Sequence, residues 1–178
     1  TGGDLYDFVP LDDKRLFLLM GDATGHGIGP ALSATQVRAM LRVALRLQSS
    51  LDDAFIHIND QLFEDLPDDR FVTGFFGLLD AATHSVRFHS GGQGPIMHFQ
   101  ADMGEYDWHP ATTFPLGYMP HTELDAPHIA VLEPGEWVLG NGWDEGKLEE
   151  LRYILAADLD SDGALEIVTA HGGGYVHV

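Results

Sequence analysis

The feature that most constrains the fold is an apolar run that ends in a glycine-rich bend. Residues 16–20 (LFLLM) are continuously apolar, and residues 21–27 (GDATGHG) follow at once. A short apolar run bounded by turn residues is typical of a strand buried on both faces. Another apolar segment, residues 5–10, precedes it across a polar turn. We therefore expect an antiparallel hairpin at the start of the chain, with Asp22 at the end of its second strand.

Two helices are expected after the bend. Residues 31–47 carry apolar side chains at helical spacing and contain no glycine or proline, which indicates an amphipathic helix. Ser50 is a suitable N-cap for a second helix over residues 54–66. Three arginines of the first helix recur every four residues and form a basic stripe, namely Arg38, Arg42 and Arg46. This stripe is either a solvated face or a docking face for an acidic partner.

The rest of the chain predicts more strands. Short β-branched or aromatic runs separated by turn residues occur at residues 71–79, 86–89, 96–99, 129–132 and 137–139. They predict an antiparallel meander. Strands, then helices, then strands again favour an α+β fold over an alternating α/β fold. Near the C-terminus we expect helices over residues 147–155 and 163–170 and a strand over residues 175–178.

Composition excludes several classes of function. The chain has 178 residues, with 9 Lys+Arg against 28 Asp+Glu, a net charge of −19 and no cysteine. Such a charge repels nucleic acid and anionic membrane surfaces, so neither is an expected partner. Without cysteine there are no disulfides, zinc fingers or thiol nucleophiles, which fits a cytoplasmic location. The length suits one domain, and no apolar run is long enough for a membrane span.

Two aspartates are candidate metal ligands. Asp22 is predicted to end a buried strand beside an open, glycine-rich backbone, and Asp4 follows two glycines on the partner strand. Carboxylate and carbonyl oxygens are the ligands that Mg²⁺ and Mn²⁺ prefer, and a bound ion lowers the pKa of its water. The alternative for Asp22 is that its carboxylate caps the following helix while the glycines serve a tight turn.

These segments resemble a known family. The segments that carry the resemblance are residues 2–7 (GGDLYD), 21–27, 71–73 (FVT), 90–95 (SGGQGP) and 115–117 (PLG). In order and spacing they are similar to the metal-dependent (type 2C, PPM) serine/threonine phosphatases, in the bacterial branch typified by stage II sporulation protein E and the sigma-regulator phosphatases. The resemblance implies a PPM-type β-sandwich of antiparallel sheets flanked by helices. We expect residues 1–178 to be a single domain excised from a longer regulatory protein.

The resemblance also implies a site and a reaction. Asp22 would bridge two metal ions, Mn²⁺ or Mg²⁺, with the Ala23 carbonyl completing a coordination shell and Asp4 at the same cluster. Metal-activated water would hydrolyse phosphoserine or phosphothreonine on a regulatory protein of the anti-sigma-antagonist type. His26 is a candidate proton donor, or else a helix-entry residue. The family further implies an upstream sensor or receiver domain and a possible homodimer through the helices of residues 31–66.

Two stretches depart from the family pattern. In the family, an apolar strand ends in Thr/Ser-Asp-Gly, and an Asp-Asp pair precedes the last strand. Here residues 140–142 read GNG, and no acidic pair precedes residues 175–178. We expect that loop residues are missing near residues 139–142 and 174–175. If the sequence is uninterrupted, the alternative is a catalytically degenerate phosphatase-like module for binding or signalling.

A calcium loop is an alternative for the segment in which Asp158, Asp160 and Asp162 alternate and Glu166 follows. The twelfth loop position would be Thr169 instead of the glutamate of an EF-hand, and a propeller-type loop would need repeats that are absent. The ten histidines show no zinc-binding spacing. A solvated loop is the simpler interpretation of this segment.

Overall fold

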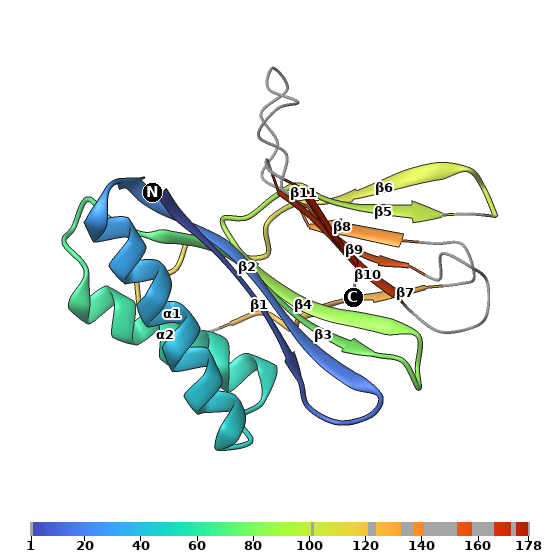
Figure 1. Cartoon of the computed structure of the whole chain (residues 1–178), viewed down its shortest axis with the longest axis horizontal. Helices are drawn as coiled ribbons and strands as arrows, with labels where there is room; N and C mark the ends of the chain where they lie inside the picture. The colour runs from blue at the N-terminus through green and yellow to red at the C-terminus, as the bar shows by residue number, and fades with distance from the viewer. Residues whose placement is uncertain are drawn as a thin grey trace.

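The computed structural model describes residues 2–100, 102–120 and 124–132, and the backbone of four further strands at residues 137–140, 153–157, 166–171 and 174–177. These residues form two antiparallel sheets and two helices, with both helices on the outer side of the first sheet (Figure 1). The α+β sandwich that we predicted from the sequence is therefore confirmed.

The first sheet contains five strands and carries the N-terminal hairpin. In spatial order they are β1 (Gly2–Pro10), β2 (Arg15–His26), β3 (Val72–Asp80), β4 (Ser85–Gly91) and β7 (His128–Val131). The helices that cover this sheet are α1 (Ile28–Arg46) and α2 (Leu51–Asp65). Ser50 caps α2 as expected, since its Oγ accepts a hydrogen bond from the Asp53 N–H at 3.0 Å.

The second sheet has six described strands. Their spatial order is β11 (Gly174–His177), β10 (Glu166–His171), β9 (Tyr153–Ala157), β8 (Trp137–Gly140), β5 (Ile96–Gln100) and β6 (Glu105–His109). β5 packs on the first sheet through Ile96, which belongs to the same buried cluster as Leu18 and Phe75.

The apolar run of β2 is buried on both faces because the first sheet is the middle layer. Phe17 and Leu19 pack under the helices, whereas Leu18 and Met20 pack against the second sheet. Successive strand residues point to opposite faces, so a continuous apolar run serves two cores at once. Each fully buried side chain of this size contributes about 1.5–3 kcal/mol.

The structure corrects the C-terminal part of the predicted fold. β9 and β10 replace the helices expected at residues 147–155 and 163–170, and the rest of those ranges lies outside the described residues. Cross-strand pairing of β9 with β8 and β10 decides the conformation here, and short apolar runs do not distinguish helix from strand. The strand expected at residues 175–178 is confirmed by β11.

The expectation that loop residues are missing near residues 139–142 and 174–175 stays a prediction. Gly174 and Tyr175 are consecutive residues of β11 and pair with His171 and Ala170. β8 runs to Gly140, and Asn141 and Gly142 lie outside the described residues.

Asp7 joins β1 to α1 through two arginines. The side chain of Asp7 is only 4% exposed. Arg42 donates from Nε to Asp7 Oδ2 at 2.6 Å and from Nη2 to Oδ1 at 2.7 Å, and Arg38 Nε donates to Oδ2 at 3.2 Å. Burial alone would raise the pKa of Asp7, but the hydrogen bonds and charges of Arg42 and Arg38 outweigh it and hold the pKa below its ordinary value. Two arginines of the predicted stripe thus attach the helix to the sheet.

We predict that Asp7→Asn lowers the free energy of unfolding by about 2 kcal/mol at pH 7, because two charged hydrogen-bond partners lose their acceptor. Since the folded-state pKa is lowered, the contribution of Asp7 is complete above about pH 4 and is lost as the pH falls through the folded value. Urea unfolding between pH 3 and 7 should give a shallower acid slope for Asp7→Asn than for the wild type. Asp12→Asn, at the exposed Arg15 ion pair, is the control and should change much less; equal losses in both variants would contradict a special role for Asp7.

Candidate functional site

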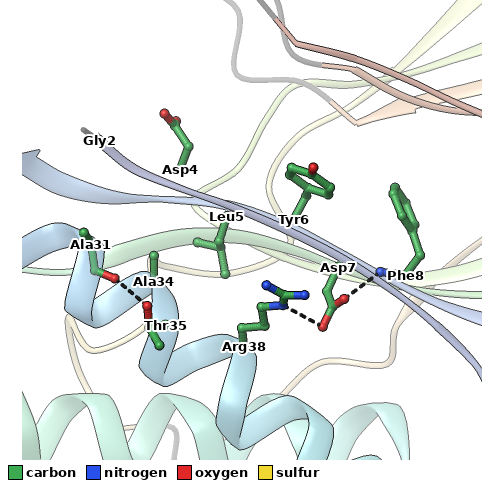
Figure 2. Close-up of a pocket in the computed structure, with 10 residues that line it drawn as sticks. All are labelled: Gly2, Asp4, Leu5, Tyr6, Asp7, Phe8, Ala31, Ala34, Thr35 and Arg38. Carbon is green, nitrogen blue, oxygen red and sulfur yellow. Dashed lines mark hydrogen bonds and ion pairs between the residues drawn. The ribbon is translucent and has the colours of Figure 1, made fainter. Parts of the chain in front are cut away.

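Asp4 and Asp22 face each other across the N-terminal hairpin. They are direct partners in the antiparallel register of β1 and β2. Such partners project to the same face of a sheet, with Cβ atoms about 5 Å apart. Figure 2 shows that Asp4 points away from α1, whereas Asp7 on the same strand points toward Arg38. The two predicted ligand carboxylates therefore share the face of the first sheet that is turned away from the helices.

Gly3 brings the Ala23 carbonyl close to β1. The register is irregular between Gly2, which pairs with His26, and Asp4, which pairs with Asp22. A Cβ atom on Gly3 would lie 2.2 Å from the Ala23 carbonyl oxygen, so only glycine permits this approach. The Ala23 side chain is 2% exposed and packs in the core beneath the helices, which fixes its backbone. All three predicted ligands thus belong to one bulged end of the hairpin.

Two threonines hold this end of β2 in place. Thr24 donates from its N–H and its Oγ1 to the Phe71 carbonyl at 3.0 and 3.1 Å, and its Oγ1 accepts from the Phe71 N–H at 3.1 Å. Thr73 Oγ1 donates to the Asp22 carbonyl at 3.3 Å. Neither threonine was predicted as a site residue, although Thr73 lies in the FVT segment that carries the resemblance.

The structure decides between the two interpretations of Asp22. The N-cap of α1 is Gly27, and no side chain accepts a capping hydrogen bond from the first turn of this helix. Gly25 and Gly27 have φ angles of 97° and 91°, which only glycine adopts at little cost, so they form the turn into α1. The expectation that Asp22 caps the helix is therefore wrong, and its carboxylate is left for another role.

Electrostatics favours a cation beside Asp22. Its side chain reaches the surface, yet neighbouring protein atoms displace part of its water, and this desolvation raises its pKa above the ordinary value. A nearby cation would offset the cost of the charged form. Asp4, Asp22 and the Ala23 carbonyl supply the hard oxygen donors that Mg²⁺ and Mn²⁺ bind with water as the remaining ligands.

The described residues of the site supply oxygen ligands for one hydrated ion. Among the described residues, no group of three or more histidine, aspartate or glutamate side chains is arranged to hold a metal. A second ion of the kind implied by the resemblance would need ligands from elsewhere. His26, the candidate proton donor, is an exposed residue at the end of β2 opposite Gly2, at the same end of the hairpin as Asp4 and Asp22.

The fold is similar to that of PP2C-type phosphatase domains, and comparison with known proteins specifies the family. The model of the family described as Stage II sporulation protein E (SpoIIE) matches residues 12–140, so the chain belongs to this family. The resemblance noted in the sequence is thereby confirmed.

Individual relatives agree with the family. The chain is 23% identical over 167 residues to the phosphoserine phosphatase RsbP of Bacillus subtilis (strain 168), covering 90% of this chain and 40% of that protein. Its fold matches the PP2C phosphatase domain of SpoIIE from Bacillus subtilis with a TM-score of 0.68 at 18% identity, covering 79% of this chain and 41% of that one. The fold also matches that of RsbX in complex with magnesium, with a TM-score of 0.64 at 16% identity. The match covers 80% of this chain and 66% of that one.

The chain spans less than half the length of the curated relative that it matches. None of the helices in the described part of the chain combines the length and apolar character of a membrane span.

We predict opposite effects of Asp22→Asn with and without metal. A raised pKa means that the folded protein binds its proton more tightly, so stability falls as the pH rises through the window above the ordinary value of 3.8. Without metal at pH 7, removing this carboxylate should therefore raise the melting temperature. With Mn²⁺, the wild type should be stabilised and the variant should bind the ion at least ten-fold more weakly.

Thermal unfolding in EDTA and in Mn²⁺, with calorimetric titration of the ion, measures both effects. Asp13→Asn, in the exposed turn between β1 and β2, is the matched control and should behave as the wild type. Equal Mn²⁺ affinity in wild type and Asp22→Asn would remove Asp22 from the candidate metal site.

Proposed function

We propose that this chain is the catalytic domain of a Mn²⁺- or Mg²⁺-dependent phosphatase that acts on phosphoserine or phosphothreonine of a regulatory protein. The observation that carries the proposal is the cross-strand pair of Asp4 and Asp22 beside the Ala23 carbonyl, on the bulged end of the hairpin. Membership of the SpoIIE family supports it, as do a relative named phosphoserine phosphatase and a similar fold crystallised with magnesium.

Each residue of the site has a separate role in the proposed reaction. Asp4, Asp22 and the Ala23 carbonyl would hold the ion, and Thr73 and Thr24 keep the end of β2 in position. A bound Mg²⁺ or Mn²⁺ would supply Lewis acidity toward phosphoryl oxygens and a water of lowered pKa. His26 would carry a proton on its imidazole to the departing serine or threonine oxygen. The two-metal site of the resembling family would need further ligands beyond the described residues.

The partners of the proposed phosphatase follow from the family. A phosphorylated regulator of the anti-sigma-antagonist type is the substrate that we propose. An upstream sensor or receiver domain is in line with a relative more than twice as long as the matched region. A homodimer through residues 31–66 is supported by exposed apolar side chains, among them Leu32 and Val43 on α1 and Leu47 directly after it.

A catalytically degenerate module for binding or signalling is the second candidate. The observation that favours it is the set of only two carboxylates at the site among the described residues, with Asn141 where the family pattern has an aspartate. Such a module would keep the fold and lose hydrolysis.

We predict Mn²⁺-dependent hydrolysis of p-nitrophenyl phosphate by the wild type. Asp22→Asn and Asp4→Asn should each lower kcat/KM at least 100-fold, because both remove a charged ligand oxygen from the site. Steady-state kinetics with Mn²⁺, with Mg²⁺ and in EDTA measures this effect, with Asp13→Asn as the control. Activity that survives in Asp22→Asn would overturn the assignment of the site, and a wild type inactive with either ion would favour the degenerate module.

A further inference from the structure

A groove runs along the outer edge of β1 beside α1. It has a volume of about 360 Å³. Its wall on the sheet side is residues 4–8 of β1, and its wall on the helix side is Ala31, Ala34, Thr35 and Arg38 (Figure 2). The helical residues are three, four and seven positions after the first, so they form one stripe along the helix. Three of the four are small, which leaves room between helix and strand.

The strand beside the groove lies at the end of its sheet. Among the described strands β1 pairs only with β2, so its other edge faces the groove. An edge strand presents backbone N–H and C=O groups at alternate positions, and an extended segment of a partner can add to it as a further strand. Main-chain hydrogen bonds of this kind give affinity with little dependence on the sequence of the partner.

The groove has different chemistry at its two ends. Asp4 of the proposed metal site lies at one end, and Arg38 lies at the other. Arg38 is 55% exposed, and its Nε donates a hydrogen bond to Asp7 Oδ2. No other hydrogen bond or ion pair joins it to the described residues. Its terminal nitrogens can therefore donate to an acidic group of a partner.

The strand sets the spacing between the two ends. Asp7, which holds Arg38, comes three residues after Asp4, or about 10 Å along an extended chain. A partner strand that adds to β1 has the same rise per residue. If one residue of the partner strand lies at Asp4, the residue of the partner that lies at Arg38 is therefore about three positions away from it.

We propose that this groove binds an extended segment of the phosphoprotein substrate as an added strand on β1, with the phosphorylated residue at the Asp4 end and an acidic residue three positions away at Arg38. The inference rests on the proposed phosphatase function. The groove shares Asp4 with the proposed metal site, so a strand seated in it delivers its phosphoryl group there. At the other end of the groove, Arg38 and Arg42 share the single carboxylate of Asp7, and the remaining positive charge is complementary to an acidic side chain, on a protein whose net charge is −19.

Peptide kinetics tests this inference. The probes are nine-residue peptides of alanine and glycine with a central phosphoserine and one glutamate moved through the other positions, each matched by a glutamine peptide. The wild type with Mn²⁺ should prefer glutamate over glutamine about five-fold in kcat/KM at three residues from the phosphoserine, on one side of it. No preference at either of these positions would overturn the proposal.

Variants of α1 test separately the contribution of the Arg38 charge and that of the open space in the groove to peptide binding. Arg38→Gln should bring the glutamate preference to about one, while Arg46→Gln, on the same helix, should keep it. Thr35→Trp fills the groove and should lower the ratio of peptide to p-nitrophenyl phosphate kcat/KM at least ten-fold. Ala39→Trp, on the exposed face of α1, should leave both substrates unchanged. A glutamate preference that survives Arg38→Gln, or an unchanged ratio in Thr35→Trp, would contradict the proposed binding mode.

The experiments distinguish an error in the proposed phosphatase function from an error in the proposed strand addition at β1. A wild type that hydrolyses neither ester nor peptide overturns the phosphatase function. The groove is then tested by calorimetric titration with the non-hydrolysable phosphonate analogue of the glutamate peptide. Binding that Thr35→Trp abolishes and Ala39→Trp retains supports strand addition at β1, and the absence of binding overturns it.

Discussion

The register of β1 against β2 is the constraint on which the rest of the structure depends. It places Asp4 opposite Asp22, and it places Gly3 where any side chain would collide with the Ala23 carbonyl. The register is specified strongly because β1 has one buried and one exposed face, so a slip by one residue would move Leu5 and Asp7 out of the layer beneath the helices. The precision of the candidate site is therefore a consequence of the packing of β1 beneath the helices.

β1 carries two carboxylates with opposite surroundings. Asp4 faces away from the helices, whereas Asp7 faces them, is almost fully buried and has its pKa lowered by Arg42 and Arg38. Asp22, opposite Asp4, has no such arginine in its described surroundings, and desolvation raises its pKa. The same residue type thus serves attachment of a helix on one face of the strand and a candidate cation site on the other.

Much of this arrangement could be predicted from the sequence. The features that could not be predicted were missed for physical reasons. The continuous apolar run of β2 predicted a doubly buried strand, and the glycine-led aspartates predicted a shared site. The role of Asp7 was missed, although a spacing of three along a strand places it on the face opposite Asp4. β9 and β10 were predicted as helices because their pairing is long-range and leaves little trace in short apolar runs. β6, an edge strand of alternating charged and aromatic residues, gave no apolar run at all.

The burial of one face of β1 also determines where the chain can change its length. A single residue inserted into β1 before Asp4 or Asp7 would rotate the following side chains to the wrong face, sending a carboxylate into the core beneath the helices and an apolar residue to the exposed face. The turn over residues 11–14 is exposed and carries no such requirement. We therefore expect insertions and deletions in this part of the chain to be tolerated in the hairpin turn and not within β1, which keeps the distance from Asp4 to the end of its strand constant.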